Sequence, residues 1–291
     1  MTGSLNLVIG IDGGGTSCRI AALCGPDRRR IEARGGPANV SDFDGAIRRL
    51  TEALDRLATD AGTTPAGMAG AVAHFGLAGV VDRKMAERVA AAFRFTRINV
   101  TDDQPTTIAG ALGAVDGAVA AIGTGSFVGR QSGGAIRACG GWGFTLGDQA
   151  SGAWLGRRIL GEALLAHDGL RDMTPLLQAM LDRFGGATGI TTFGVAAAPA
   201  DFASLAPDIL TAARSGDLSA DQAFRDGAQY IEGALSALGW QPGEPLCLVG
   251  GLGPDYRDWL DGEVAASCMT PKGNALDGAL ALASRLAEER P

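Results

Sequence analysis

Apolar and polar positions along the chain follow strand-like and helix-like patterns in turn. Short apolar runs rich in β-branched residues predict buried strands at residues 7–13, 69–77, 98–101, 114–122 and 245–249. Apolar residues recur at helical spacing in 42–61, 82–93, 105–112, 153–166 and 219–238. Prolines and glycines divide the helical stretch 168–213, and an alanine-rich helix begins near residue 274. This order of elements predicts a mixed α/β protein.

The first strand ends in one carboxylate and three glycines, and a second strand-like run follows them. Asp12 at the end of a buried strand is costly without a partner, and a magnesium ion with its water shell is one such partner. Gly13, Gly14 and Gly15 allow backbone amides to approach an anion closely, and Thr16 adds a hydroxyl donor. These residues indicate a phosphate and magnesium site, with a tight hairpin and a solvated aspartate as the alternative.

The same pattern recurs where the run 114–122 ends in the turn 123–126 and a strand-like segment follows. This recurrence predicts two structurally related halves, each with one phosphate-binding hairpin, around a cleft. A dinucleotide-binding loop should open directly into a helix, so the second turn fits that function poorly. The sequence also contains no GxxxxGK[ST] motif, which excludes a P-loop.

An acidic pair, Asp102 and Asp103, follows the predicted strand 98–101 and precedes a helix that begins at Pro105. Ligands of α/β sheets bind outside the carboxyl ends of the strands. One aspartate of the pair is expected to cap the helix, which leaves the other for catalysis. The chain has only two histidines, and His74 lies in an apolar run where we expect a core residue. Acid–base chemistry would therefore fall to carboxylates.

Composition narrows the class of protein. The 291 residues are 46% hydrophobic and 20% charged, which is typical of a globular protein with one large or two ordinary domains. The net charge of −7 argues against nucleic acid or an anionic membrane as the main partner. Five scattered cysteines without a CxxC pair support neither a zinc ribbon nor a disulfide framework. With no signal-like or membrane-length apolar run, we expect a reduced, cytoplasmic protein.

Taken together, the motifs resemble the BadF/BadG/BcrA/BcrD ATPase family and its N-acetylglucosamine kinase and glucosamine kinase members. These belong to the superfamily of sugar kinases, heat-shock chaperones and actin. Residues 11–16 resemble the first phosphate motif, 122–126 the second, and 248–252 the adenosine motif. The run 139–149 is similar to the CGGWG…GDE run of amino-sugar kinases, with Gln149 in place of the usual glutamate. The resemblance extends from Leu7 to about Ala283.

The resemblance implies an α/β fold of two ribonuclease H-like (actin-like ATPase) lobes around a nucleotide and sugar cleft. The N-terminal lobe would comprise residues 1–113, with the phosphate-1 hairpin and the catalytic aspartate. The C-terminal lobe would comprise 114–291, with the phosphate-2 and adenosine motifs and a helical insertion. The last helix, about 274–291, is expected to pack back on the N-terminal lobe. A homodimer is expected as well.

The resemblance also implies that ATP and Mg²⁺ are used to phosphorylate an amino sugar, N-acetylglucosamine or glucosamine, at its 6-hydroxyl. By spacing, Asp103 is the expected base and Asp102 the second choice, and Asp12 would hold Mg²⁺ through water. The residues expected to bind ATP and its phosphates are Gly13, Gly14, Gly15, Thr16, Gly123, Thr124, Gly125, Ser126, Gly250, Gly251 and Leu252. The residues expected at the sugar are Asn39, Asp103, Cys139, Gly141, Trp142 and Asp148.

Purely structural roles for some of these residues, and other functions for the chain, are the alternatives to this interpretation. Core packing is the alternative for Cys139 and Trp142, and helix capping is the alternative for Asp148. An ATPase that activates a partner enzyme through a bridging iron–sulfur cluster needs thiolates from each chain at one site, and the cysteines show no such paired spacing. A non-catalytic sugar sensor would be expected to lose Asp12 or the base, and both are present. A dinucleotide-dependent oxidoreductase is disfavoured by the strand after the second turn.

Overall fold

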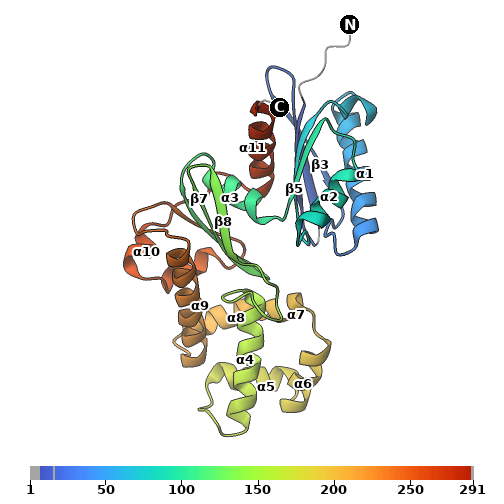
Figure 1. The fold of residues 1–291 in the computed structure, drawn as a ribbon. Helices are drawn as coiled ribbons and strands as arrows, with labels where there is room; N and C mark the ends of the chain where they lie inside the picture. Colours follow the sequence, from blue (N-terminus) through green and yellow to red (C-terminus); the bar gives the residue numbers. More distant parts are fainter. Residues whose placement is uncertain (1–6, 16, 290–291) are drawn as a thin grey trace. The chain divides into compact units, whose positions relative to one another are not determined.

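The computed structural model describes residues 7–15 and 17–289, and these residues divide between two compact units (Figure 1). The first unit takes the chain up to residue 115 and again from 271 onward, and the second takes 116–270. We expected the boundary after residue 113, close to this one. Within the described part of the chain, no helix has the length and apolar character needed to cross a membrane.

The first unit is built on a five-stranded sheet with the strand order β3-β2-β1-β4-β5. Its strands are β1 (Val8–Gly13), β2 (Cys18–Cys24), β3 (Arg29–Gly35), β4 (Val72–Leu77) and β5 (Arg97–Thr101). Strand β1 runs antiparallel to β2 and parallel to β4, and β5 continues the parallel side. The carboxyl ends of β1, β4 and β5 therefore lie at the same edge, as expected for a ligand site in such a sheet.

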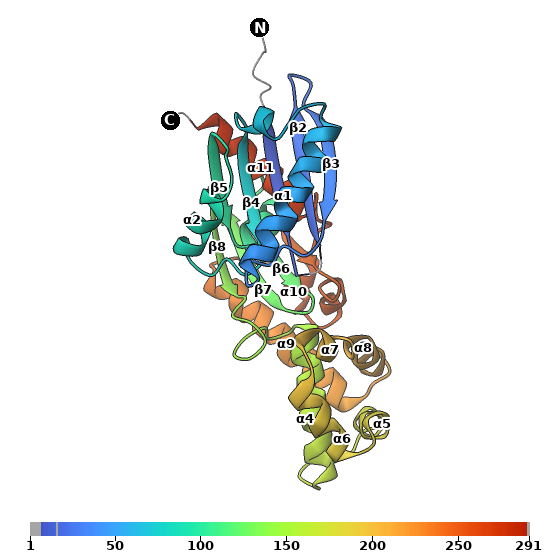
Figure 2. The same cartoon turned by 90° about the vertical axis from the view of Figure 1, so that its right-hand side faces the viewer.

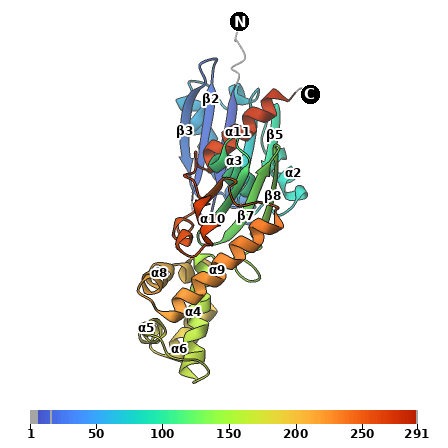
Figure 3. The ribbon, with the colours of Figure 1, turned by 90° about the vertical axis from the view of Figure 1, so that its left-hand side faces the viewer.

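Helices cover both faces of this sheet, as Figures 2 and 3 show from opposite sides. The helices of the first unit are α1 (Phe43–Asp60), α2 (Arg83–Ala91), α3 (Gln104–Leu112) and α11 (Ala275–Glu288), with a 3-10 turn η1 (Ala66–Met68). Helices α1 and α2 lie on one face, and α3 and α11 on the other. A Cβ atom at Gly10 would lie 2.6 Å from the backbone nitrogen of Leu280, so only glycine lets α11 approach β1 so closely.

The second unit repeats this arrangement with a four-stranded sheet of order β8-β7-β6-β9. Its strands are β6 (Gly117–Ile122), β7 (Ser126–Ser132), β8 (Ala135–Gly140) and β9 (Leu246–Val249). Strand β6 is antiparallel to β7 and parallel to β9, just as β1 is antiparallel to β2 and parallel to β4. The expected repeat of strand, turn and strand is confirmed in the order and direction of the strands.

Between β8 and β9 the chain forms a helical region. It contains α4 (Gly152–His167), α5 (Pro175–Phe184), α6 (Ala187–Ala196), α7 (Pro199–Ala203), α8 (Ala206–Arg214) and α9 (Leu218–Ala237). After β9 come the 3-10 helix η2 (Pro254–Asp258) and α10 (Gly262–Ala266). Apolar side chains from β6, β9 and these helices, such as Ile122, Leu248 and Phe224, form one continuous core.

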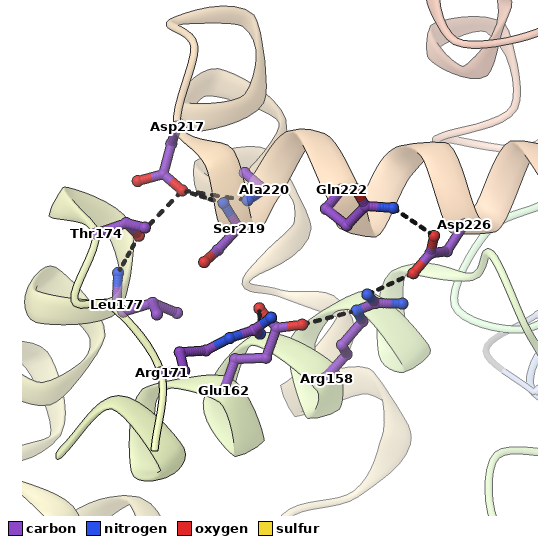
Figure 4. A network of polar contacts seen from close by, with 10 residues as sticks. All are labelled: Arg158, Glu162, Arg171, Thr174, Leu177, Asp217, Ser219, Ala220, Gln222 and Asp226. Atoms are coloured by element: carbon purple, nitrogen blue, oxygen red, sulfur yellow. Dashed lines mark hydrogen bonds and ion pairs between the residues drawn. The ribbon is translucent and has the colours of Figure 1, made fainter. Parts of the chain in front are cut away.

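Two polar clusters connect α4, α5 and α9 (Figure 4). Glu162 on α4 is nearly buried, and it is ion-paired with Arg158 and Arg171. Arg158 also reaches Asp226 on α9 at 2.5 Å. Buried charge is tolerated only when it is paired in this way, so the cluster fixes α9 against α4.

Asp217 forms the second cluster at the start of α9. Its carboxylate accepts hydrogen bonds from the backbone amides of Ser219 and Ala220, which are unpaired donors of the first turn of α9. It also accepts from the hydroxyl of Thr174 and the amide of Leu176 at the start of α5. One carboxylate therefore binds the starts of two helices, and Figure 4 shows its contacts with Thr174, Ser219 and Ala220.

Two edge strands, β3 and β8, were not predicted. Strand β3 carries four charged side chains, Arg29, Arg30, Glu32 and Arg34, and most of its residues are exposed. Strand β8 is exposed or half-buried throughout. Edge strands of this kind lack the alternating apolar pattern by which a half-buried strand is recognised, because little of their surface faces a core.

Candidate active site

Asp12 lies near the carboxyl end of β1, directly opposite Arg19 on β2. The Nε and Nη2 atoms of Arg19 donate to Oδ2 of Asp12 at 3.0 and 2.5 Å. The Asp12 side chain is 16% exposed, so this guanidinium compensates a largely desolvated charge. The sequence indicated that Asp12 needs a partner, but it did not identify Arg19, whose role depends on the pairing register of the hairpin.

The turn after Asp12 is fixed by its own backbone. The amide of Gly14 donates to the carbonyl of Ser17 at 3.0 Å, and the carbonyl of Gly14 accepts from Ala38 at 2.9 Å. A Cβ atom at Gly13 would lie 2.5 Å from Cδ2 of Leu77 and 3.1 Å from the Cβ of Ala38, so a larger residue there would force neighbouring side chains to shift. Thr16, expected to contact phosphate, lies outside the described residues.

The two aspartates after β5 have different environments. Oδ1 of Asp102 accepts from the amide of Gln104 at 3.2 Å. Asp103 is the residue that precedes α3, yet among the described residues its carboxylate makes no capping hydrogen bond to that helix. Burial raises the pKa of Asp103, and the negative charges of Asp102 and Asp12 raise it further. A carboxyl group with a raised pKa is better suited to accept a proton near neutral pH.

A chain of side chains holds this acidic pair in place. Nδ2 of Asn99 lies 3.2 Å from Nδ1 of His74, and Nε2 of His74 lies 3.3 Å from the hydroxyl of Thr101. Thr101 in turn donates to the carbonyl of Asp102 at 2.7 Å. His74 is 2% exposed, and burial lowers its pKa to about 4. The expectation of a satisfied core histidine is confirmed, and the contacts add that it supports the end of β5.

Asn39, an expected sugar ligand, lies in the same unit just after the segment bonded to Gly14. Its Oδ1 accepts from the amide of Ser41 at 2.9 Å. Gly79 has a φ of +89° and passes so close that a Cβ atom there would lie 2.4 Å from the same oxygen. Positive φ and this close approach both require glycine at position 79. The first unit thus brings together Asp12, the Gly13–Gly15 turn, the segment before Asn39, and Asp103.

In the second unit, the carbonyl of Ile122 at the end of β6 is the junction between two expected motifs. It accepts from the amides of Leu252 and Gly253 at 3.0 and 3.1 Å. Gly250 has a φ of +87°, and a Cβ atom there would lie 2.3 Å from this same carbonyl oxygen. The expected adenosine turn is therefore held against the base of the expected phosphate turn.

The phosphate turn also joins the start of α4. The amide of Gly152 donates to the carbonyl of Gly123 at 2.8 Å, and that of Ala153 donates to Thr124 at 3.3 Å. The turn is thus fixed on the side of α4 as well, before any ligand arrives.

Three glycines of the expected ATP motifs stand apart from the rest. Cβ atoms built at Gly15, Gly123 and Gly251 would meet nothing within 4 Å among the described residues, and none of the three has a positive φ. Neither packing nor backbone conformation therefore demands glycine at these positions. Close approach of a ligand to the backbone is a remaining reason for glycine.

Asp148 lies in a tight turn before α4 and is 7% exposed. Its carboxylate faces the phosphate turn, because a Cβ atom at Gly125 would lie 2.9 Å from its Oδ2. Burial raises the pKa of Asp148, although hydrogen bonds from the backbone amides of Ser126 and Gly143 lower it in part. The hydroxyl of Ser126 donates to the carbonyl of Gln149 at 2.5 Å. In this arrangement Ser126 binds the turn that carries Asp148, a role that the sequence did not indicate.

The other expected sugar residues lie beside this turn. The amide of Gly141 donates to the carbonyl of Ser126 at 2.9 Å. Cys139 at the end of β8 is half-buried at the margin of the core. Trp142 is 82% exposed, so the alternative that it is a core residue is wrong. A large exposed indole next to a glycine-rich turn is a surface that a ring-shaped ligand could cover.

The oxygen donors of the first unit fit a magnesium ion held through water. Among the described residues, no group of three or more His, Cys, Asp or Glu side chains could hold a metal ion by itself. Asp12 and Asp103 nevertheless offer carboxylate oxygens, the donor type that Mg²⁺ prefers. Mg²⁺ commonly keeps several waters and binds through one or two carboxylates plus substrate phosphates, so this donor set fits it.

Similarity to known proteins extends over nearly the whole chain. The sequence profile of the BadF/BadG/BcrA/BcrD ATPase family matches residues 9–274. The chain belongs to this family. It is 31% identical over 284 residues to glucosamine kinase GspK of Vibrio cholerae serotype O1, covering 97% of each chain.

Solved structures of two proteins are similar to this chain along nearly its whole length. A protein from Chromobacterium violaceum, provisionally described as an N-acetylglucosamine kinase, is 35% identical, with a TM-score of 0.84 over 96% of this chain and 99% of that one. A second protein with the same provisional description, from Porphyromonas gingivalis, is 18% identical, with a TM-score of 0.68 over 97% and 100% of the two chains. The expected family is confirmed, as is the α/β fold with two ribonuclease H-like, actin-like ATPase lobes.

His74 makes stability depend on pH. Its pKa is about 4 in the folded protein against an ordinary value of 6.5, so the unfolded chain binds a proton first as the pH falls. The part of the folding free energy that depends on a neutral His74 is fully present above pH 6.5 and is lost as the pH falls toward 4. Between pH 7.5 and pH 5 the free energy of unfolding should drop by about 2 kcal/mol more in the natural protein than in His74→Gln, measured by urea denaturation.

The raised pKa values of Asp102, Asp103 and Asp148 act in the opposite sense, because those groups bind protons more readily when folded. They are present in both proteins, so the difference between the two pH profiles isolates His74. Parallel profiles would contradict the lowered pKa of the buried His74.

Proposed function

We propose that the chain is an ATP-dependent kinase that phosphorylates an amino sugar, N-acetylglucosamine or glucosamine, at its 6-hydroxyl. Family membership and the full-length similarity to a glucosamine kinase support this function. The observation that carries it is the position of Asp103. Its half-buried carboxylate lies at the carboxyl ends of the strands and has a pKa raised by desolvation. It makes no hydrogen bond to the start of α3, where Asp102 accepts from the amide of Gln104 instead.

In the proposed reaction, Asp103 accepts the proton of the sugar hydroxyl while the hydroxyl oxygen forms a bond to the γ-phosphorus of ATP. The bond between the γ-phosphorus and the bridging oxygen breaks, and ADP leaves with the electron pair. Phosphoryl transfer of this kind depends mainly on positioning and on charge stabilisation. The His74–Thr101–Asp102 contacts serve the positioning, because they fix the backbone that carries Asp103.

The nucleotide would be bound by backbone groups of both units. In the first unit we assign the triphosphate to the turn 13–16, and in the second to 123–126, with Gly250, Gly251 and Leu252 against the adenosine. Asp12, kept oriented by Arg19, would hold Mg²⁺ through water. When bound, this ion neutralises negative charge on the phosphates and bridges them.

The sugar would be bound by Asn39, Asp103 and Asp148, with Cys139, Gly141 and Trp142 forming the wall of its pocket. A carboxylate suits a sugar because it can accept hydrogen bonds from two hydroxyl groups at once. The turn that presents Asp148 is adjacent to the exposed Trp142, since a Cβ atom at Gly147 would lie 2.9 Å from the Cβ of Trp142. We further propose that the protein is a homodimer. We also propose that it is cytoplasmic, in keeping with cysteines that form no disulfide bond with one another among the described residues.

The direct test is ADP release by the purified protein with ATP and Mg²⁺. The acceptors would be N-acetylglucosamine, glucosamine, glucose, N-acetylmannosamine and N-acetylmuramic acid, with a sample that lacks sugar as the control. We expect release that depends on one of the first two sugars. Release that is equal without sugar would instead favour an ATPase that activates a partner enzyme.

The acidic pair gives a second test. Asp103→Asn should lower kcat by about a thousandfold or more, because the variant cannot accept the hydroxyl proton. Nucleotide affinity, measured by calorimetry, should change little. Asp102→Asn is the matched control, since it keeps an oxygen that can accept from Gln104 and should retain most activity. If Asp102→Asn abolishes turnover while Asp103→Asn remains active, the two roles are reversed.

The open glycines give a third test. Gly123→Ala should raise the KM for ATP about tenfold, because a methyl group would occupy space left for phosphate, while the melting temperature stays close to that of the natural protein. Gly250→Ala is the comparison, since its positive φ and contact with Ile122 should cost stability of about 1–3 kcal/mol. Unchanged ATP affinity in Gly123→Ala would argue against phosphate binding at this turn.

A further inference from the structure

The turn that presents Asp148 has an unusual backbone. Asp148 has a φ of +57° and Ala150 a φ of +70°, so two non-glycine residues of one turn lie in the left-handed region. Each such residue costs on the order of 1 kcal/mol or more. A strained conformation of this kind persists only where its neighbours hold it, and strain of this kind tends to occur at functional sites.

Two hydroxyl groups hold the turn by its carbonyls. Ser126 donates to the carbonyl of Gln149 at 2.5 Å, and Tyr256 donates to the carbonyl of Ala150 at 2.7 Å. Ser126 belongs to the expected phosphate motif, whereas Tyr256 lies 106 residues beyond Ala150 and belongs to no motif recognised in the sequence. Its side chain is fully buried, at 0% exposure.

Tyr256 is itself held rigidly. It lies on η2, which begins directly after Gly253, one of the two residues that donate to the carbonyl of Ile122. Arg214 pairs with Asp255 and Asp258 on either side of it at 2.9 Å each. The ring packs against Phe224 with centroids 5.1 Å apart.

Helix α9 also makes room for this ring. A Cβ atom at Gly227 would lie 2.4 Å from the Tyr256 hydroxyl oxygen, so the phenol crosses α9 where a glycine leaves space. Because its own position is fixed on several sides, Tyr256 can hold the carbonyl of Ala150 in one place.

We propose that Tyr256 is a positioning residue: its hydroxyl keeps the turn 148–150 in its left-handed conformation and so keeps the Asp148 carboxylate where the sugar binds. It does not touch the reacting atoms. It acts from the segment that follows the adenosine turn, and it fixes the turn that precedes α4. The part that concerns the sugar rests on the proposed function, whereas the part that concerns the turn does not.

The test compares Tyr256→Phe with Trp259→Phe. The first variant removes only the hydroxyl that binds Ala150. The second removes the indole nitrogen, which donates to Asp221 at 2.8 Å. Trp259 belongs to the same aromatic cluster, but among the described residues its hydrogen bonds do not reach the turn. In Tyr256→Phe we expect the KM for the amino sugar to rise about tenfold, with the KM for ATP within about twofold of the natural value. In Trp259→Phe the KM values for the amino sugar and for ATP should both stay close to those of the natural protein.

Hydrogen exchange without ligands separates the two parts of the proposal. Backbone amides of 148–153 should exchange at least about fivefold faster in Tyr256→Phe than in Trp259→Phe. Unchanged exchange there, or equal rises of both KM values in both variants, would overturn the positioning role. If the natural protein phosphorylates no amino sugar, the proposed function fails while the exchange data still decide whether Tyr256 holds the turn.

Discussion

In the second unit, the position of one turn against another depends on a single carbonyl group, that of Ile122. This oxygen accepts two amides from the segment after β9, and it lies so near Gly250 that no side chain fits between them. Strands β6 and β9 run parallel, so their carboxyl ends already meet at one edge. The carbonyl of Ile122 joins the turns that follow these two strands, and the contacts of Tyr256 and Ser126 extend the same rigid assembly to Asp148.

The two units share a strand order but differ in the chemistry that they carry at this edge. The first unit concentrates charge, with Asp12, Arg19, Asp102 and Asp103 near the ends of its strands. The second supplies mainly neutral backbone groups and one carboxylate, Asp148, whose amide partners come from its own turns. The acidic groups of the first unit repel one another, and the contacts of the buried His74 with Asn99 and Thr101 support the strand end that carries two of them. The backbone turns of the second unit are held by hydrogen bonds to neighbouring segments.

Much of the fold could be predicted because its signals are local. The strands at both hairpins, the amphipathic helices and the two glycine turns each show their pattern within a short window, and all were placed within a few residues. The edge strands β3 and β8 were not predicted, because a largely exposed strand does not need an apolar face. The acidic pair was recognised, but which member caps α3 follows from hydrogen bonds that only the structure displays.

The partners of the site residues were harder to foresee. The sequence did not identify Arg19 as the partner of Asp12, because their pairing depends on the register between β1 and β2. Tyr256 reaches Ala150 across 106 residues, and one sequence contains no signal for such a contact. Motifs in the sequence were enough to propose residues for the chemistry, whereas the residues that hold them in place could not be proposed from the sequence.

The last helix has a consequence for how the protein is made. Helix α11 supplies Leu276 and Leu280 to one face of the first sheet. The backbone of α11 lies so close to Gly10 on β1 that it leaves no room for a side chain there. Because α11 follows all the strands of both sheets in the chain, the ribosome releases it after those strands have emerged. Domains tend to fold as units during synthesis, so the second unit can fold from a continuous segment while one face of the first sheet still lacks its cover. We therefore expect the nascent first unit to be the part that needs chaperone protection until α11 has emerged.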